Sequence, residues 1–522
     1  MSYYQLSTQD LLSINTLGEL KKAGYEAQSI HGELRRNLIT HIKAKKSVFE
    51  GIWGYEDTVI PDVQRAILSQ HHINLLGLRG QAKTRIARLM IDLLDEVVPM
   101  VAGAELNDDP LAPISLYAKQ LIAEKGDQTS IEWIHRNERY TEKLATPDVS
   151  VADLIGDVDP IKAANLKLSY ADERVIHYGL IPRANRGIFV INELPDLQAR
   201  IQVSLFNILQ EGDIQIRGFK LRLPLDIQFV FTANPEDYTN RGSIVTPLKD
   251  RIDSQIITHY PKNIEIGKKI TQQEARISAQ QKEIVRVNPM LENLIEEIAM
   301  EARTSEYVDA KSGVSARLTI SAYENLISAA ERRALVNSEK NTQARIADFV
   351  GIVPSITGKI ELVYEGEQEG ALVVAQNLIG KAVRKMFMGF FPDPEKIKKQ
   401  KGANPYKPIT DWFGAGNVTD ILNDCTEQEY KNALFKVVGL SELIELYHSS
   451  EDYATKLLLM EFALHGLAEY SMLSRNSLHT GFEFRDLLSS MFQMPSAYDD
   501  DDDEDYDDDD DDDDNKGGGF RR

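Results

Sequence analysis

The sequence predicts an α/β protein in which a parallel sheet flanked by helices is followed by an all-helical domain and a helical C-terminal extension. Three observations predict this order. Up to about residue 260, short apolar runs of strand length alternate with amphipathic stretches of helical spacing. Beyond residue 261 the runs stop and helical periodicity takes over. A glycine-rich segment ending in Lys83 and Thr84 follows the first apolar run, as expected of a phosphate-binding loop between a strand and a helix.

The strands and helices can be placed from these patterns. Residues 213–223 alternate around Arg217 and Gly218, which predicts a hairpin. Leucine and isoleucine recur at helical spacing before the first strand, and residues 440–492 show helical periodicity again. The predicted strands of the parallel sheet are residues 73–76, 187–191, 227–232 and 255–260.

Changes in residue composition and hydrophobic periodicity along the chain predict five parts. Thr84 and Asn192 are separated by an unusually long stretch of 108 residues, so an insertion is expected there. The final part is an Asp run whose self-repulsion prevents collapse, which predicts disorder. The parts are a helical N-terminal extension (1–45), an α/β domain (46–260, with the insertion at about 99–150), a helical domain (261–365), a helical C-terminal region (366–497) and the acidic tail (498–522).

Composition narrows the class of protein. The formal charge of -22 comes largely from residues 499–514, which hold 15 acidic side chains; without residues 499–522 the chain has 66 acidic and 56 basic residues. A nucleic-acid partner is therefore not expected. The single cysteine, Cys425, favours a reducing compartment, with the cytoplasm as the default. Neither a signal peptide nor a membrane span is expected, because no apolar stretch has the required length.

The strongest local motif is the loop at residues 77–84, GLRGQAKT. Such a loop needs small residues so that backbone N–H groups can wrap phosphates, a lysine that reaches the terminal phosphates, and a hydroxyl for magnesium. Ala82 stands where the motif has its second glycine, and an alanine is tolerated there only if the backbone avoids a positive φ. A chance glycine-rich turn is the alternative. The candidate nucleotide-binding residues are Gly77, Gly80, Gln81, Ala82, Lys83 and Thr84.

A second motif ends the buried run at residues 187–191 with Asn192 and Glu193. At such a position one side chain serves the magnesium ion, and a glutamate can polarise the attacking water. We expect Glu193 to be the base and Asn192 to face the metal, together with Thr84. Metal affinity should be weaker than with Asp, because an amide oxygen carries no full charge. The alternative is that the pair only caps a buried strand.

Three further polar residues follow in an order that supports this interpretation. Asn234 ends the next apolar run and could orient water near the γ-phosphate. Arg251 could stabilise transition-state charge, most plausibly in the site of a neighbouring subunit. Arg317 opens a long helix in the second domain, where a cation could touch the phosphates. For either arginine the alternative is an ordinary surface residue.

Taken together, these elements resemble an AAA+ ATPase. Their sequences are most similar to the branch of the magnesium-chelatase ATPase subunit and its MoxR-like relatives. The stretch GLIPRANRGIFVINE at residues 179–193, continued by LQEGDIQIRG at 209–218, is similar to that branch's G-L-x-x-R-A-x-R-G-I…D-E and L-Q-E-G-x-x-x-I-R-G. Residues 153–159, DLIGDVD, resemble the segment that precedes it in chelatase subunits. The resemblance covers roughly residues 46–360.

The resemblance implies a ring-forming motor, with a hexamer favoured, that binds ATP and Mg²⁺ between subunits. Lys83 and Thr84 would hold phosphate and magnesium, and Glu193 would activate water. Asn234 would sense the γ-phosphate, Arg251 would act in trans, and Arg317 would be the sensor of the helical lid domain. The hairpin would face the partner to be remodelled, and a separate protein with a von Willebrand A-type domain is the expected partner. Ala82 and Asn192 depart from the family pattern and imply slow turnover.

Two other functions remain open at this point. The chain could be a genuine magnesium-chelatase subunit that inserts Mg into protoporphyrin, although the acidic tail and C-terminal region are not expected of a plain chelatase subunit. It could also be a nucleotide-gated scaffold with little hydrolysis, which Ala82 and Asn192 favour. The retained residues Lys83, Glu193, Asn234 and Arg251 oppose this alternative.

Overall fold

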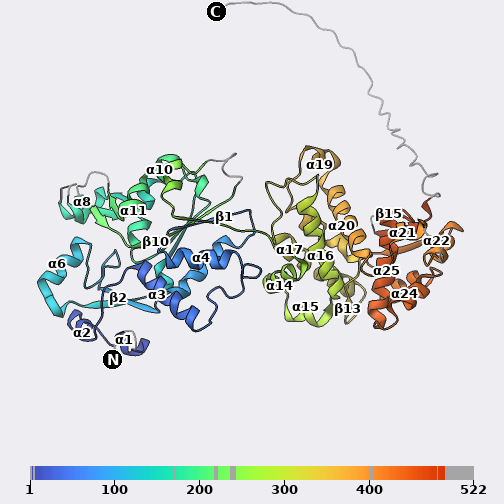
Figure 1. Ribbon diagram of the computed structural model, residues 1–522, viewed down its shortest axis with the longest axis horizontal. Coiled ribbons are helices and arrows are strands. Elements are labelled where there is room, and N and C mark those ends of the chain that lie inside the picture. The colour runs from blue at the N-terminus through green and yellow to red at the C-terminus, as the bar shows by residue number, and fades with distance from the viewer. Residues whose placement is uncertain are drawn as a thin grey trace, which may run out of the picture.

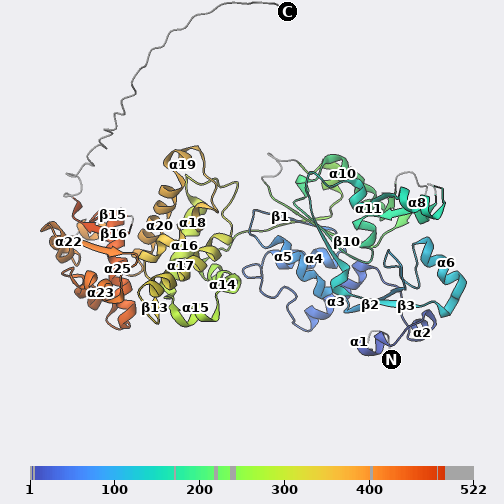
Figure 2. The ribbon, with the colours of Figure 1, turned by 180° about the vertical axis from the view of Figure 1, so that it is seen from behind.

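The computed structural model describes residues 3, 6–169, 172–216, 222–235, 243–399, 404–478 and 480–487. An α/β part, coloured blue to green, is followed along the chain by a helical part, coloured yellow to red (Figures 1 and 2). The acidic tail and the tip of the hairpin at Arg217 and Gly218 lie outside the described residues. No helix in the described part of the chain is long and apolar enough to cross a membrane.

The α/β part contains a five-stranded parallel sheet in the order β11-β1-β10-β7-β4. Each of the four predicted apolar runs contains a strand of this sheet, although the strand in the run 255–260 ends at Ile257. Every residue of β7 and β10 is buried, as expected of a parallel sheet covered on both faces. The strands are β1 (Ile73–Leu76), β4 (Tyr140–Leu144), β7 (Gly187–Asn192), β10 (Ile227–Ala233) and β11 (Ser254–Ile257).

The predicted insertion at about 99–150 is too long, because its end forms edge strand β4 of the main sheet. This strand pairs parallel with β7, Tyr140 opposite Ile188 and Leu144 opposite Asn192, so the end of that segment belongs to the main sheet. Its sequence, YTEKL, has no apolar run because an edge strand packs against one neighbour only, and this hid it from the analysis of periodicity. The inserted part is the antiparallel pair β2 (Val97–Val101) and β3 (Ile131–His135), with α6 (Leu116–Lys125) between them.

The predicted N-terminal extension at 1–45 is wrong in one respect, because its last helix, α3 (Ile30–Lys43), covers the sheet. Leu34 and Leu38 of α3 lie fully buried in one core with α4 (Val59–Leu68) and α5 (Lys83–Leu89). Alternate residues of each strand point to opposite faces, so Val190 joins this core and Phe189 joins the core on the other face. The earlier helices α1 (Thr8–Leu12) and α2 (Leu17–Lys22) lie beside the β2–β3 pair, where Leu20 packs with Ile131.

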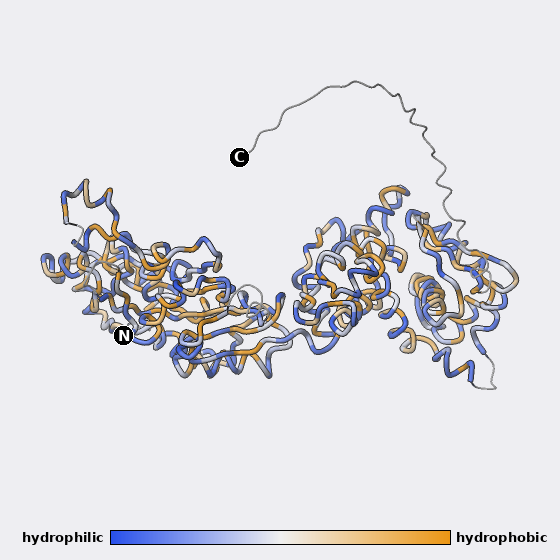
Figure 3. Tube along the Cα trace, turned by 90° about the horizontal axis from the view of Figure 1, so that it is seen from above, coloured by the Kyte–Doolittle hydropathy of each residue, from blue (hydrophilic) through white to orange (hydrophobic). Residues whose placement is uncertain are grey.

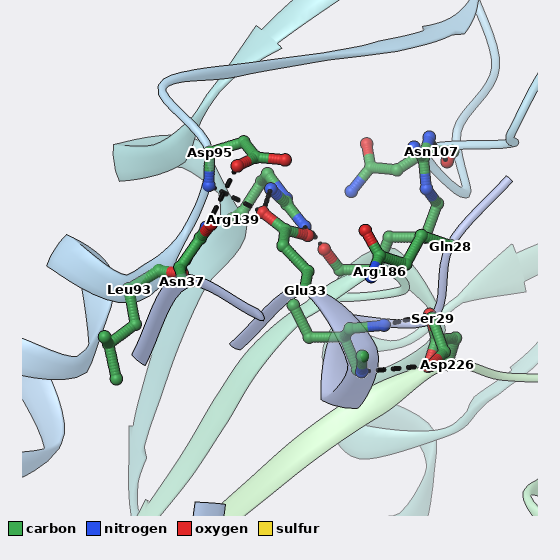
Figure 4. Close-up of polar contacts among 12 residues, drawn as sticks. Gln28, Ser29, Glu33, Asn37, Leu93, Asp95, Asn107, Arg139, Arg186 and Asp226 are labelled. Atoms are coloured by element: carbon green, nitrogen blue, oxygen red, sulfur yellow. Dashed lines mark hydrogen bonds and ion pairs between the residues drawn. The ribbon is translucent and has the colours of Figure 1, made fainter. Parts of the chain in front are cut away.

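A buried polar cluster ties α3 to the amino ends of the strands (Figure 4). Arg139, one residue before β4, donates to both carboxylate oxygens of Glu33 on α3, at 2.7 and 2.6 Å. The same guanidinium donates to the carbonyl of Arg186, one residue before β7, at 2.8 Å. Asp226, one residue before β10, accepts from the N–H of Ile30 at 2.7 Å. The cluster therefore holds α3, β4, β7 and β10 together at one edge of the sheet.

The remaining segments of the α/β part lie on the side of the sheet opposite α3. They include the predicted hairpin, whose described residues form the antiparallel strands β8 (Asp213–Gln215) and β9 (Arg222–Pro224). The others are α7 (Val151–Leu154), β5 (Gly156–Val158), α8 (Pro160–Leu166), β6 (Ile176–Tyr178), α9 (Leu180–Arg183), α10 (Ala199–Ser204), α11 (Phe206–Glu211) and α13 (Thr246–Asp250).

The helical part does not divide at residue 365 as predicted. One hydrophobic core runs from Val285 to Phe484, and α20 packs against both α16 and α25. Hydrophobic residues gather along the central strands of the sheet and inside this helical body (Figure 3). The main helices are α14 (Ile264–Glu274), α15 (Ala279–Ile284), α16 (Pro289–Thr304), α17 (Arg317–Val336), α18 (Val353–Thr357), α20 (Ala371–Phe387), α22 (Lys407–Gly414), α23 (Glu427–Phe435), α24 (Leu440–His448) and α25 (Tyr453–Glu469).

A small antiparallel sheet corrects the helical prediction for residues 440–492. Strands β14 (Thr419–Leu422), β15 (Ser474–Leu478) and β16 (Gly481–Arg485) pair in the order β14-β16-β15. In β16, Phe484 is buried in the helical core while Glu483 and Arg485 alternate with it, which is the period of a strand. The run is short, and the helical periodicity before it concealed the change.

His72, the residue directly before β1, makes an acid-sensitive contact. Its Nδ1 accepts from the N–H of Phe229 at 3.3 Å, and its ring lies 5.3 Å from that of His31 on α3. Burial, with His31 nearby, lowers the pKa of His72 to about 4, although Asp253 acts in the opposite direction. The folded protein therefore holds His72 neutral, and its protonation would break the contact with Phe229.

We predict that acid destabilises the α/β part partly through His72. Because the pKa is lower in the folded than in the unfolded chain, stability is complete above pH 6.5 and falls as the pH drops towards 4. The loss attributable to His72 should be about 2 kcal/mol between pH 7 and pH 4.5. The measurement is the thermal unfolding of wild type and His72→Gln at both pH values. The variant should lose less stability than wild type, whereas His71→Gln should behave as wild type. Equal acid sensitivity in all three proteins would contradict the assignment.

Candidate active site

The glycine-rich loop lies at the carboxyl edge of the sheet, between β1 and α5, where neighbouring side chains leave little room for a Cβ at its glycines. A Cβ on Gly77 would lie 2.0 Å from Thr258 Oγ1, and one on Gly80 would lie 2.1 Å from Ser315 Oγ. Gly80 also has a φ of +73°, a conformation that L side chains rarely adopt. Gln81, also in the loop, accepts from the Thr258 hydroxyl at 2.7 Å. The loop is thus packed against β11 and the start of α17.

Ala82 does not avoid a positive φ, contrary to the condition set by the sequence. Its φ is +57° and its ψ is +17°, directly before α5. A non-glycine residue in this left-handed conformation costs about 1 kcal/mol. The loop therefore keeps the conformation that its missing glycine would provide, at the expense of strain at the N-terminus of the helix.

Lys83, Asn234 and Glu193 form a chain of hydrogen bonds across the edge of the sheet. Lys83 Nζ donates to Asn234 Oδ1 at 2.5 Å and to the carbonyls of Leu78, at 3.0 Å, and of Gly77. Asn234 Nδ2 then donates to Glu193 Oε2 at 2.8 Å. Glu193 has a φ of +55°, so its backbone is strained where its carboxylate faces the loop. The structure thus brings together three of the predicted residues.

Asn192 and Thr84 meet beside this chain. Thr84 Oγ1 donates to Asn192 Oδ1 at 3.2 Å, and Thr232 Oγ1 donates to the same oxygen at 3.1 Å. The other end of the amide, Nδ2, donates to Glu142 Oε1 at 2.6 Å. Asn192 therefore joins the loop, strand β10 and strand β4.

The loop opens into a cleft of about 630 Å³ between the α/β part and the helical part. Arg317, the first residue of α17, lines it together with the loop and Glu193. Arg79 binds the two parts together, since its Nε donates to the Ser312 carbonyl at 3.1 Å and its guanidinium pairs with Glu361. The far wall consists of residues 51–55 with His259, Pro261, Ile270, Gln273 and Glu274.

Arg251 does not reach this cleft. Its guanidinium donates to Gln210 Oε1 at 3.0 Å and to the Pro247 carbonyl at 2.8 Å, and lies 5.0 Å from the Phe206 ring. Within one chain, Arg251 is therefore separate from the other candidate residues.

Several cleft residues escaped the analysis of the sequence. Tyr55 donates to the carbonyls of Gln81, at 3.1 Å, and His259, at 2.6 Å, and burial raises its pKa to about 12, so it remains a donor. Trp53 donates to Gln273 at 2.7 Å. The aromatic and glycine residues of the segment GIWGY were the available signal. The sequence contains no such signal for Glu142, because this residue lies in a polar edge strand.

The residues present fit a nucleotide with magnesium. Backbone N–H groups of a glycine-lined loop, a lysine at a helix start and a threonine hydroxyl are the groups that phosphates and Mg²⁺ require. Among the residues that the structure describes, no group of three or more His, Cys, Asp or Glu could hold a metal ion alone.

Comparisons with known proteins point in the same direction. Residues 166–256 match the family model of the Sigma-54 interaction domain. The magnesium-chelatase 38 kDa subunit of Cereibacter sphaeroides is 26% identical over 194 residues, which are 37% of this chain and 52% of that protein. The chain thus spans about half the length of this curated relative.

Two solved structures are also similar. A proposed ATPase from Cytophaga hutchinsonii is 17% identical, with a TM-score of 0.27, over 70% of this chain and 98% of its own. A complex between subunits BchI and BchD of magnesium chelatase is 18% identical, with a TM-score of 0.32, over 61% of this chain and 98% of the matched one.

The sheet, the loop and the sequence matches resemble the same group of proteins. In the sheet, β10 lies beside β1, the strand that precedes the loop, and Asn234 directly follows β10. The next strand, β7, ends at Asn192 and is followed by Glu193. The match to the family model lies within this α/β part. In its sheet, its loop and its sequence the chain resembles the AAA+ ATPases of the magnesium-chelatase and MoxR-like branch.

Proposed function

We propose that this protein is a ring-forming motor that hydrolyses ATP and remodels a protein partner. The observation that carries the proposal is the hydrogen-bonded chain from Lys83 through Asn234 to Glu193 beside the loop. It joins a phosphate ligand, a polar sensor and a base in one row, which is the arrangement that phosphoryl transfer to water needs.

Each residue has a definite task in this proposal. Glu193 accepts the proton of the attacking water, and Asn234 holds the Glu193 carboxylate in place through its amide. Lys83 donates to phosphate oxygens from the N-terminus of α5, and Thr84 with Asn192 offers oxygens to the metal. Magnesium, when bound, neutralises developing charge on the phosphates. Arg317 adds a positive charge from the helical part.

In a ring of subunits, the cleft of one chain receives Arg251 from its neighbour. Because Arg251 lies off its own cleft, its contribution to catalysis requires the cleft of a neighbouring subunit, and we favour a hexamer. The hairpin β8–β9 is the proposed contact for the remodelled partner, a separate protein with a von Willebrand A-type domain. The strained Ala82 favours one alternative, a nucleotide-gated scaffold with little hydrolysis.

We predict steady-state ATP hydrolysis whose rate per subunit rises with protein concentration, because active sites are completed between subunits. Lys83→Ala should abolish nucleotide binding, and Glu193→Gln should lower turnover by about 10²-fold or more while nucleotide still binds. The checks are phosphate release and binding of a fluorescent ADP. Wild-type binding without hydrolysis at any concentration would refute the motor and favour the scaffold.

Mixing two inactive variants tests the role of Arg251 in trans. Arg251→Ala should lower turnover by about 10³-fold. A mixture with Glu193→Gln should regain activity, because an interface that joins an intact Arg251 to an intact Glu193 is again complete; random mixing predicts about a quarter of the wild-type rate. Arg200→Ala, at an exposed residue of α10, is the matched control and should hydrolyse as wild type. An inactive mixture would place Arg251 outside the reaction.

Ala82→Gly tests whether backbone strain slows the site. Glycine tolerates the observed φ, so the free energy of unfolding should rise by about 1 kcal/mol, and ATP turnover should also rise. Gln70→Gly is the control, since exposed Gln70 has a φ of +61° far from the loop. It should change stability alone. Unchanged turnover in Ala82→Gly would mean that the strain does not limit hydrolysis.

A further inference from the structure

The amide of Asn192 has a defined orientation because of Glu142. A carboxylate can only accept hydrogen bonds at neutral pH, so the contact of 2.6 Å with Glu142 Oε1 must come from the NH₂ group of Asn192. The carbonyl oxygen is thereby turned towards Thr84 and Thr232, whose hydroxyls donate to it. Glu142 thus decides which atom of Asn192 faces the predicted metal position.

Glu142 also brings a negative charge to a place where the sequence has only an amide. Strand β4 runs parallel to β7 with Glu142 opposite Val190, and the Glu142 side chain reaches two residues further along β7 to Asn192. The Glu142 side chain is 23% exposed, and its second oxygen pairs with Arg88 Nε at 2.9 Å. The first oxygen therefore faces the site, and the second faces a cation at the rim.

The two residues are complementary in charge. An aspartate in place of Asn192 would set two carboxylates in contact, and two carboxylates that share a contact cannot both remain ionised. One carboxylate and one amide hold the net charge that a single aspartate would provide. Asn192 is therefore explained by its neighbour, and it does not by itself indicate a decayed site.

We propose that Glu142 is the positioning residue and source of negative charge for the magnesium site, replacing the charge that Asn192 lacks. The inference deepens the proposed function and rests on it, because the magnesium would enter with a nucleotide. Loss of such a neighbouring partner typically weakens metal binding by 10- to 100-fold, which sets the size of the expected effect at about tenfold.

The test measures how much Mg²⁺ strengthens nucleotide binding. Full-length wild type and variants are titrated with fluorescent ADP, once with Mg²⁺ and once with EDTA, and the ratio of the two affinities is compared. Glu142→Gln should lose about tenfold of this ratio. The double variant Asn192→Asp with Glu142→Gln should recover it, because the charge returns at the neighbouring position. Asn192→Asp alone should not exceed wild type.

Two controls separate this role from a structural one. Glu138→Gln makes the same change at an exposed residue just before β4 and should keep the wild-type ratio. Arg88→Met removes the ion pair but leaves Glu142, and it should not lower the ratio. A drop in Arg88→Met equal to that in Glu142→Gln would overturn the proposal. So would a loss in Glu142→Gln that the added Asn192→Asp substitution fails to restore in the double variant.

The outcome is distinguishable from a failure of the proposed function. If wild type binds no ADP with or without Mg²⁺, the proposed function fails. If wild type binds ADP more tightly with Mg²⁺ and Glu142→Gln keeps the full ratio, the assignment of Glu142 alone is wrong.

Discussion

Arg139 holds the edge strand of the sheet, and the arrangement of the site depends on that strand. Its buried guanidinium bonds to both oxygens of Glu33 and to the carbonyl of Arg186, so it joins α3, β4 and β7. Breaking a buried pair of this kind leaves an uncompensated charge, which typically costs about 3 to 5 kcal/mol. From the middle of the same strand, the Glu142 side chain reaches Asn192 at the end of β7. The anchor at the amino edge thus maintains the contact at the carboxyl edge.

The carboxyl edge concentrates polar groups and backbone strain in one place. Lys83, Asn192, Glu193 and Asn234 each follow or end a buried strand, or begin the helix after it, so the parallel register alone brings them into one row. Ala82 and Glu193 adopt left-handed backbone conformations there. Strain at two residues that flank the same cleft is maintained by the surrounding packing, as is common at functional sites.

The helical part is coupled directly to the loop. Arg79 contacts Ser312 and Glu361, and Arg85 pairs with Glu274 on α14, while Arg317 lines the cleft. Because a single core joins the lid helices to the C-terminal region, a movement of the lid about the cleft would carry that region with it. The C-terminal region is thereby connected to the helices that line the cleft.

The sequence by itself determined the four apolar strands, the loop and the residues Lys83, Thr84, Asn192, Glu193 and Asn234, because buried parallel strands and phosphate loops have strong local patterns. Edge strand β4, the role of α3 as a sheet-covering helix and the small C-terminal sheet were decided by tertiary packing. So were the positive φ of Ala82 and the separation of Arg251 from the cleft. Asn192 looked like a defect in the sequence because its partner lies 50 residues earlier, and only the pairing of β4 with β7 brings the two side chains into contact.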